Sequence, residues 1–517
     1  MAAPQNYAPR SLPDSIKDLG LTQVVKDYMS FPKKPDTKTA CTAMCNALRH
    51  SMPSEVSFPG SESYTTNKAS YWAKQQSEIS PTCFLAVKTS RSIAVALILS
   101  QVSGCPFIIR AGGTSDVPGA SNTALGVTID LRAFNKVTLS TDKKIATVDS
   151  GAFWGDVYKE LDPQQVTVAG GRASTVGVGG LSLGGGVSYI AGRAGLTCDT
   201  VLKYTIMMAD GQILEVDQHS HPLLYLALRG GGNNFGVVLK FDFETYPVAQ
   251  MWGGFRSYVA ADTKNIISRG LSSYNANPMG NEDFALITTY AARNGTFFST
   301  VGLSNAKPEA DPPIYKSNFP DLLKIKPLVD STRTTTTKGM TDELARRLPP
   351  GLRNQFTTIT FKNDAELQNK LVDIYMEEAT KLKPQLSTEE GFLPAIVIQP
   401  IPTTITSKLK KRGGNALGLS ESDGPLILVN ISFQWSAVVD DKVVLPAVQR
   451  ILERTKAWAQ ARGLTHRYIY LNYAAPLQKP ITSYGPENVK KLRQAQMKYD
   501  PRKVFELNQP GGFKLNM

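Results

Sequence analysis

The sequence predicts an α+β fold in which a glycine-rich domain is interrupted by a second domain of different composition. The chain has 517 residues, which is too long for one simple core. Glycines gather in segments 110–122 and 170–186, and short strand and helix patterns surround them. From about residue 250 the glycine density falls, and longer strand patterns alternate with amphipathic helices.

Short strand patterns alternate with one apolar helix before the first glycine segment. Residues 1–70 are expected to be helical and irregular, and strands at 86–87 and 106–110 flank a helix over 92–100. This order is the crossover unit of a parallel or mixed sheet. Further strands are predicted at 126–131 and 145–149. A hairpin is predicted from 201–209 and 212–216, with its turn at Asp210-Gly211.

The second half has the pattern of an antiparallel sheet with helices on one face. Strands are expected at 282–292, 394–399 and 425–435. One helix should cover 363–382, with Asn363 or Asp364 as its N-cap. Another should cover 441–462, with Gly463 just past its end.

Composition describes an ordinary globular protein, with 42% hydrophobic and 20% charged residues. No apolar run is long enough for a membrane span. The net charge of +13 is spread along the chain, and its one tight cluster, at 408–412, is interpreted as a solvated helix end or loop. Nucleic acid is therefore not expected as a partner. Residues 1–10 lack the apolar core of a signal peptide, so the chain is either intracellular or secreted with its leader removed.

Five cysteines, at 41, 45, 83, 105 and 198, do not suggest a disulfide scaffold because their number is odd and low. Cys41 and Cys45 are one helical turn apart, and His50 follows them. A zinc site would need a fourth ligand and tighter grouping. We therefore expect structural or disulfide-forming cysteines and no metal.

The first glycine segment follows a strand and has no acidic side chain before Asp116. Its consecutive backbone N–H groups can form an anion-binding nest, because glycine lets the backbone approach a ligand closely. Three other glycine-containing motifs do not match the sequence: a hydrolase nucleophile elbow, a Rossmann motif and a P-loop. Residues 180–184 fit G-x-S-x-G but lack the flanking strand and helix of a hydrolase elbow. A Rossmann motif would need glycine at Ser182, and no P-loop is present.

The order and spacing of the motifs resemble the vanillyl-alcohol oxidase / p-cresol methylhydroxylase superfamily and, within it, the fungal berberine-bridge-enzyme-like oxidases. The resemblance covers about residues 35–517 and also includes 232–238, 471–474 and 499–513. It implies a p-cresol methylhydroxylase-type FAD-binding domain with an inserted substrate domain of antiparallel sheet plus helices. The implied segments are 1–75 (an N-terminal helical part of the FAD domain), 76–248 (FAD-binding), 249–465 (substrate domain) and 466–517, which returns to the FAD domain.

The resemblance also assigns residues to the cofactor. The implied FAD-binding positions are Arg110, Ala111, Gly112, Gly113, Thr114, Ser115, Ser121, Thr175, Val176, Gly177, Gly179, Gly180, Ser182, Gly185, Gly195, Asp199, Gly236, Val237, Val238, Asn472 and Asn508.

Both positions that attach flavin covalently in relatives differ here. Thr114 stands in place of the flavin-linking His, and Ala173 in place of a second linking Cys. A threonine hydroxyl is a poor nucleophile without an adjacent base. We therefore predict non-covalent FAD with a lowered potential, which makes the enzyme either a weaker oxidant than its relatives or one that has abandoned redox chemistry.

Candidate substrate-facing residues come from strand alternation. Asn430, Ser432 and Gln434 share one face of strand 425–435, while the alternating apolar residues share the other. In the family the corresponding sheet floors the active site. Tyr473 is the candidate base, although a phenol must be made more acidic to serve near neutral pH. Without a strong base, direct hydride removal to flavin N5, with reoxidation by O₂, is the more natural step.

Three functions remain open at this stage. The first is an FAD-dependent oxidase or oxidative cyclase acting on a small molecule, as in fungal-type secondary metabolism. The second is a non-redox cyclase or pericyclase that keeps FAD as a scaffold. The third is an alcohol or carbohydrate oxidase, and production of H₂O₂ separates the first and third from the second.

Overall fold

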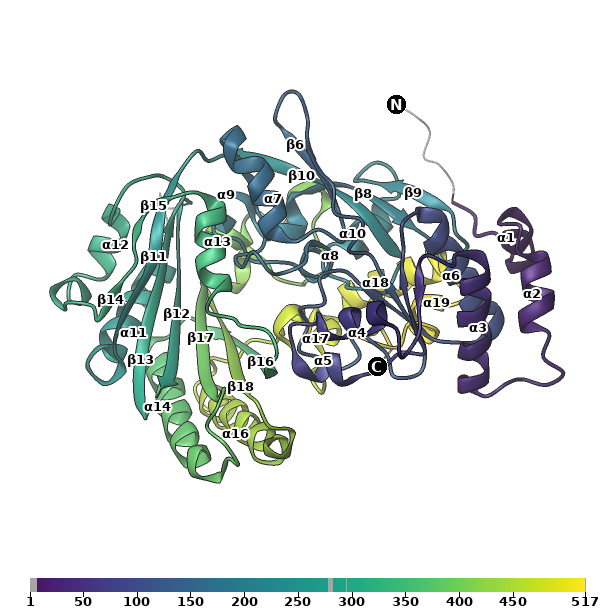
Figure 1. Cartoon of the computed structure of the whole chain (residues 1–517). Coiled ribbons are helices and arrows are strands. Elements are labelled where there is room, and N and C mark those ends of the chain that lie inside the picture. Colours follow the sequence, from purple (N-terminus) through teal and green to yellow (C-terminus); the bar gives the residue numbers. More distant parts are fainter. Residues whose placement is uncertain (1–6, 278–281, 294, 517) are drawn as a thin grey trace.

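The computed structural model describes residues 7–277, 282–293 and 295–516, whose strands form three sheets (Figure 1). The first sheet has the order β1-β2-β4-β3. Its strands are β1 (Val56–Ser57), β2 (Cys83–Ala86), β3 (Phe107–Arg110) and β4 (Val127–Asp130). β2 and β3 both pair in parallel with β4, and helix α6 (Ser90–Ser103) is the crossover between them.

The predicted strand–helix–strand unit is confirmed, with shifted bounds. The strand ends at Ala86, so Val87 lies outside it. The helix extends beyond 92–100 because the Thr89 side chain caps its first turn and Gly104, with φ +75°, ends it in the left-handed region.

The second sheet has the order β5-β6-β10-β8-β9, and β7 pairs with the far end of β10. The strands are β5 (Val137–Leu139), β6 (Ile145–Asp149), β7 (Val166–Val168), β8 (Val201–Met207), β9 (Ile213–Val216) and β10 (Val237–Pro247). The predicted hairpin is confirmed, because β8 and β9 pair antiparallel and Gly211 takes a φ of +83° in the turn.

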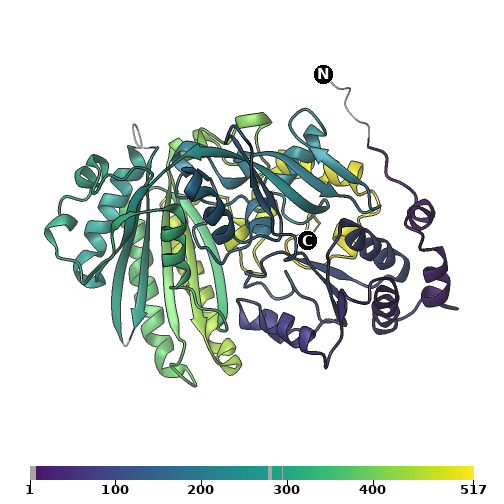
Figure 2. The same cartoon turned by 45° about the horizontal axis from the view of Figure 1, so that its top comes forward.

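The third sheet has the order β14-β11-β13-β12-β17-β18-β16, with β15 beside β11. It forms a separate layer beside the glycine-rich part (Figure 2). Its strands are β11 (Met251–Val259), β12 (Phe284–Arg293), β13 (Thr296–Asn305), β14 (Val329–Asp330), β15 (Arg333–Thr335), β16 (Arg353–Lys362), β17 (Leu393–Ile401) and β18 (Leu426–Trp435).

Three long helices share a core with one face of this sheet: α11 (Ala260–Ala276), α14 (Ala365–Leu382) and α16 (Asp441–Gln460). Asp364 is the N-cap of α14, since its side chain accepts a hydrogen bond from the Leu367 N–H. The helix predicted to reach residue 462 ends at Gln460, and Gly463 follows with φ +65°.

The remaining helices lie before, between and after the sheets. They are α1 (Leu12–Asp18), α2 (Thr22–Met29), α3 (Thr37–Ser51), α4 (Glu62–Ala69), α5 (Lys74–Glu78), α7 (Trp154–Leu161), α8 (Val178–Leu183), α9 (Ala191–Ala194), α10 (Pro222–Leu228), α12 (Pro313–Asn318), α13 (Thr337–Ala345), α15 (Thr403–Thr406), α17 (Pro480–Ser483), α18 (Pro486–Tyr499) and α19 (Val504–Leu507). Across the described ranges, none of the helices has the length and apolar character needed to cross a membrane.

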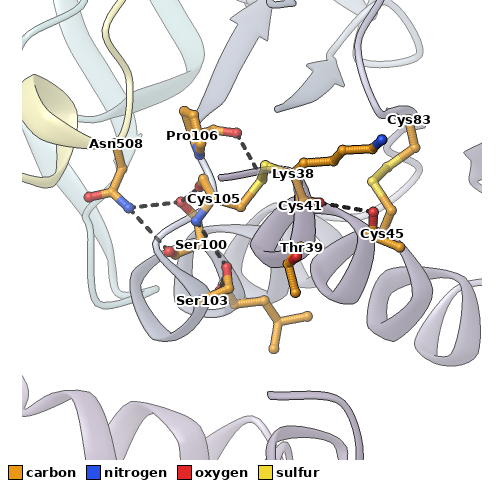
Figure 3. Close-up of a disulfide and its surroundings, with 12 residues drawn as sticks. Lys38, Thr39, Cys41, Cys45, Cys83, Ser100, Ser103, Cys105, Pro106 and Asn508 are labelled. Carbon is orange, nitrogen blue, oxygen red and sulfur yellow. Dashed lines mark hydrogen bonds between the residues drawn. A yellow bond between two sulfur atoms is a disulfide. The ribbon is translucent and has the colours of Figure 1, made fainter. Parts of the chain in front are cut away.

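Two disulfides connect α3 to the first sheet (Figure 3). Cys41 pairs with Cys105 just before β3, and Cys45 pairs with Cys83 at the start of β2. Cys198 is buried as a free thiol. Four of the five cysteines are thus disulfide-bonded, which is one of the two alternatives that the sequence left open.

The C-terminal segment packs against the second sheet. Tyr468, Tyr484 and Leu492 are buried in the same core as Tyr204 and Phe241 of β8 and β10. The fold is therefore α+β, with the chain passing through the third sheet before returning to the second. The segment bounds 75/76, 248/249 and 465/466 stay a prediction.

Candidate active site

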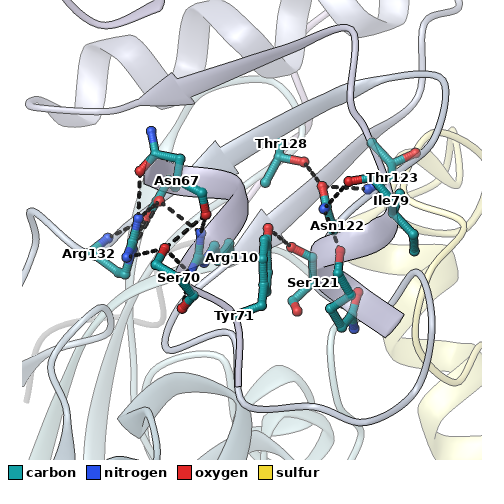
Figure 4. Close-up of polar contacts among 12 residues, drawn as sticks. Asn67, Ser70, Tyr71, Ile79, Arg110, Ser121, Asn122, Thr123, Thr128 and Arg132 are labelled. Atoms are coloured by element: carbon teal, nitrogen blue, oxygen red, sulfur yellow. Dashed lines mark hydrogen bonds and ion pairs between the residues drawn. The ribbon is translucent and has the colours of Figure 1, made fainter. Parts of the chain in front are cut away.

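The first glycine loop begins at the end of β3 and is held by Arg110. The buried Arg110 guanidinium lies 3.7 Å from the centre of the Tyr71 ring and donates to the carbonyls of Asn67 and Ser70 (Figure 4). Its Nη1 is also 3.7 Å from an Asp130 carboxylate oxygen. The Arg110 side chain is therefore occupied by protein groups, and it anchors the loop.

Beyond Arg110 the loop exposes a row of backbone donors. Within the described chain, the N–H groups of Gly112, Gly113, Thr114 and Ser115 have no hydrogen-bond acceptor. Gly113 has φ +71°, and a Cβ there would meet Arg110 and Tyr71. Successive unpaired N–H groups around a left-handed residue are the components of an anion-binding nest.

The second glycine loop packs directly on the first. A Cβ on Gly112 would lie 2.6 Å from the Cα of Gly177, and a Cβ on Gly177 would lie equally close to Gly112. Only glycine allows this approach. Further along, Gly180 of α8 faces open space, and the hydroxyls of Ser121 and Ser150 are buried without a partner in the described ranges.

These features fit FAD. The pyrophosphate of the cofactor needs several donors, and the unpaired N–H groups of the first loop supply them. Among the predicted residues, the structure brings Gly112 against Gly177 and Ala111 against Gly179, where the two loops meet. Arg110, Ala111, Thr175, Val176, Gly179 and Ser182 belong to the same two loops and to α8.

The two positions that the resemblance predicts for covalent attachment carry neither His nor Cys. Thr114 is half-buried, and its hydroxyl has no hydrogen-bond partner in the described part of the chain. Ala173 is 5% exposed and presents only a methyl group. All four histidines, at 50, 219, 221 and 466, lie outside the glycine loops in the sequence.

The Asp199 carboxylate interacts with three groups of the protein itself. Its carboxylate lies 3.2 Å from the Arg229 guanidinium, and both side chains are fully buried. It also accepts hydrogen bonds from the Leu196 N–H and the Asn415 amide. Burial raises the pKa of Asp199 to about 6, and the Arg229 charge opposes that rise. Asp199 thus braces the turn at Gly195, where φ is +92°.

Four further predicted cofactor residues also make contacts within the protein. Val237 and Val238 point into the cores on opposite sides of β10, and a Cβ on Gly236 would collide with Ile206. The Asn508 amide donates to the carbonyl and hydroxyl of Ser100 at the end of α6 (Figure 3). These contacts pack and brace the surrounding elements, and a contact of these residues with FAD stays a prediction.

Asn472 and Gly185 do join the second glycine loop. The Asn472 amide donates to the Leu181 carbonyl, and its side chain fills the space where a Cβ on Gly184 would stand. Gly185 has φ +118° and packs against Tyr470. The C-terminal segment therefore closes over the end of this loop.

A buried carboxyl connects the first loop to the third sheet. Asp116 accepts a 2.7 Å hydrogen bond from the Phe356 N–H on β16. Burial raises the pKa of Asp116 to about 7, although that hydrogen bond opposes the rise. Phe356 in turn lies edge-on to the Tyr473 ring at 5.9 Å.

Strand β18 presents the two faces that its alternation predicts. Val429, Ile431, Phe433 and Trp435 are buried in the core shared with α14 and α16. Asn430 and Gln434, 4% and 2% exposed, and the half-buried Ser432 alternate with them. The Gln434 amide donates to the Asn354 side chain, whereas the Asn430 Oδ1 has no partner in the described ranges.

A cluster that sequence reasoning missed joins the second loop to this sheet. Arg172 Nη2 donates to Gln399 Oε1 at 2.6 Å and to the Tyr473 hydroxyl at 2.9 Å. Arg172 and Gln399 also line a cavity of about 40 Å³ between the glycine-rich part and β12 and β17. One signal could have revealed the cluster, because Arg172 is the sole charged residue of segment 170–186.

Comparison with known proteins agrees with this geometry. Residues 81–217 match the family described as "FAD binding domain", and residues 469–510 match "Berberine and berberine like". The chain is 38% identical over 451 residues to FAD-dependent monooxygenase tpcD of Cochliobolus heterostrophus, covering 86% of this chain and 87% of that protein. It is also 38% identical to FAD-dependent monooxygenase FUP4 of Fusarium proliferatum, over 86% and 87%.

Solved structures show the same fold at low identity. A variant of berberine bridge enzyme aligns with a TM-score of 0.73 at 17% identity, covering 89% of this chain and 98% of that one. 6-Hydroxy-D-nicotine oxidase from Arthrobacter nicotinovorans aligns with a TM-score of 0.71 at 19% identity, over 88% and 97%.

The fold and the paired glycine loops define an FAD-dependent oxidoreductase with a p-cresol methylhydroxylase-type FAD-binding domain. Within that class, the chain belongs to the berberine-bridge-enzyme-like family, among fungal relatives named FAD-dependent monooxygenases.

Proposed function

We propose that this enzyme is an oxidase or oxidative cyclase for a small organic molecule of fungal secondary metabolism, with FAD held non-covalently and O₂ as electron acceptor. The observation that supports it is the pairing of the glycine loops at Gly112 and Gly177, with Thr114 and Ala173 at the attachment positions. When bound, FAD supplies hydride-accepting chemistry and the return of electrons to O₂.

The residues of this chain would hold the cofactor and prepare the substrate. Backbone N–H groups of residues 112–115 would bind the pyrophosphate, and the tight contact at Gly177 would fix the two loops. Asn430 and Ser432 are polar groups beside the Arg172 cluster on the same sheet and would orient the substrate.

Tyr473 is the proposed proton acceptor. Its hydroxyl receives a 2.9 Å hydrogen bond from the Arg172 guanidinium, which fixes the position of the Tyr473 Oη. Phe356 and Tyr470 pack edge-on against its ring, which restricts water around it. The Tyr473 Oη can therefore take a substrate proton while the hydride leaves.

Monooxygenation is a second candidate, favoured by the names of the relatives. The two reactions differ in the fate of oxygen, since an oxidase releases both atoms as H₂O₂ and a monooxygenase places one in the product. A non-redox cyclase would use no O₂. Measurement of O₂ uptake, peroxide and ¹⁸O incorporation with an accepted substrate separates the three.

The first test is an absorption spectrum of the purified protein before and after acid precipitation. We expect flavin bands that move entirely to the supernatant. Flavin that stays in the pellet would contradict non-covalent binding and would mean that another residue forms the link. A colourless protein that FAD does not reconstitute would contradict the oxidase.

A further inference from the structure

Arg172 is a partly buried cation without an acidic partner. The other inward-facing arginines have carboxylates nearby: Arg110 has Asp130 and Arg229 has Asp199. Within the described ranges no carboxylate lies within ion-pair distance of Arg172. Both of its hydrogen bonds start from Nη2, so Nε and Nη1 have no acceptor in the described part of the chain.

The surroundings of Arg172 contain a second unused donor. Gln399 is 2% exposed; its Oε1 is taken by Arg172, and its Nε2 is buried without an acceptor in the part of the chain described. Both side chains line the same cavity. Tyr189 fixes the loop there, since its hydroxyl donates to the Arg172 carbonyl. The cavity wall therefore carries a positive charge, on Arg172, and a hydrogen-bond donor without an acceptor, on Gln399.

Resting on the proposed function, we propose that Arg172 binds an anionic oxygen of the substrate, as a carboxylate or an ionised enol or phenol, with Gln399 Nε2 as a second donor. A guanidinium presents a planar set of donors that matches such an oxygen group, and partial burial strengthens the attraction. The net charge of +13 also favours the approach of anions.

This binding would place the anion beside the proton acceptor. Arg172 Nη2 already donates to the Tyr473 hydroxyl. A substrate oxygen bound to Nη1 or Nε of the same guanidinium would therefore lie near that hydroxyl. Arg172 is then a specificity residue that selects the ionised substrate and positions it.

The test is isothermal titration calorimetry on the flavin-loaded protein with three probes: benzoate, its neutral analogue benzamide, and an acidic cyclic β-diketone. We expect at least one anion to bind ten-fold or more tightly than benzamide. Preference for benzoate points to carboxylates, and preference for the diketone points to enolates. Equal binding of all three probes, or no binding of either anion, overturns the proposal.

Variants assign the effect to the guanidinium. Arg172→Gln should weaken anion binding at least ten-fold without changing benzamide binding, and Arg172→Lys should restore part of it. Arg269→Gln, at an exposed position on α11, is the matched control and should change nothing. Unchanged anion binding in Arg172→Gln overturns the proposal. Loss of flavin from Arg172→Gln also overturns it, because the guanidinium then serves the cofactor.

The proposed function has a separate readout. Flavin content is measured by absorbance in each preparation, whereas anion preference is measured as heat. A wild-type protein that takes up no FAD contradicts the proposed oxidase whether or not it prefers anions. A flavin-loaded protein without anion preference contradicts only the role of Arg172.

Discussion

At the scale of single residues, Thr114 and Ala173 carry the proposal that the cofactor is held without a covalent bond. Neither can form the bonds that attach flavin in relatives, and the donors around them are backbone groups. Under the proposed non-covalent binding, cofactor retention would depend on the shape of the glycine loops. The sequence revealed this point because the substitution falls inside a recognisable motif.

Restoring the histidine should restore the attachment. Thr114→His is expected to produce flavin that stays with the acid-precipitated protein, because the imidazole would stand where relatives carry their linking residue. Retention is measured by absorbance of pellet and supernatant. Thr380→His, at an exposed site on α14 outside the glycine loops, should release all of its flavin. Complete release from Thr114→His would show that this position is not beside the flavin methyl edge.

The Asp116 carboxyl should make stability depend on pH. Burial raises its pKa from 3.8 to about 7, so the folded protein binds this proton more tightly than the unfolded chain. Its stabilising contribution is fully present below pH 3.8 and is lost as pH rises toward 7. Asp116→Asn keeps an acceptor for the Phe356 N–H without the charge.

We therefore expect Asp116→Asn to melt about 2–5 °C above the wild type at pH 8, with a smaller difference at pH 5. Differential scanning calorimetry at the two pH values measures this change. Asp27→Asn, at an exposed site on α2, should show no such dependence. A variant less stable than the wild type at pH 8 would show that the ionised form is favoured in the fold.

At the scale of elements, the sequence predicted those features that depend only on residues close together in the chain. The two faces of β18, the cap of α14 and the β8/β9 hairpin all follow from short-range alternation and turn chemistry. Strand β16 was not predicted, although it pairs with β18 along its whole length. Its threonines, isoleucine and phenylalanines favour a strand, so this element was within reach of the sequence.

The bridge from α3 to β2 should stabilise the FAD domain. Cys45 and Cys83 close a loop of 38 residues, and restricting such a loop in the unfolded chain is worth about 3–4 kcal/mol. Replacing both with Ser should lower the free energy of unfolding by that order, as measured by denaturant titration. Cys198→Ala, which removes a thiol without cutting a bridge, should cost less. Equal losses would mean that burial, rather than the bridge, stabilises this region.

At the scale of the molecule, several polar contacts hold the glycine-rich part against the third sheet. Asp116 binds the Phe356 N–H, Arg172 binds Gln399, and Arg353 of β16 forms an ion pair with Glu78 at 2.5 Å. Gln75 of α5 also bonds to both the N–H and the carbonyl of Asn354. The two parts are therefore expected to unfold together.

FAD should stabilise both parts at once. A ligand at one hundred times its Kd adds about 2.7 kcal/mol to the stability of whatever unfolds with its site. Calorimetry of the apoprotein with and without FAD should show one transition that moves upward as a whole. Two transitions, of which FAD moves only one, would contradict the coupling. Arg353→Gln, which removes the ion pair with Glu78, should weaken this coupling and separate the two transitions.

The parts of the site that consist of consecutive residues were predictable from the sequence. The parts that join residues far apart in the chain were not. The glycine loops stood out because their function depends on consecutive residues. The Arg172 cluster and the contact of Asp116 with β16 join residues more than two hundred positions apart, and no spacing in the sequence connects them. Asp199 and Asn508 were assigned through family motifs, and their partners Arg229 and Ser100 became visible only in three dimensions.

The disulfides have a topological consequence. The bridge from Cys45 to Cys83 is nested inside the one from Cys41 to Cys105. A protease that cuts the backbone once anywhere between Cys45 and Cys83 would therefore leave two fragments that remain tethered through two independent crosslinks. Such a nicked molecule would run as a single band on a non-reducing gel and would divide only after reduction.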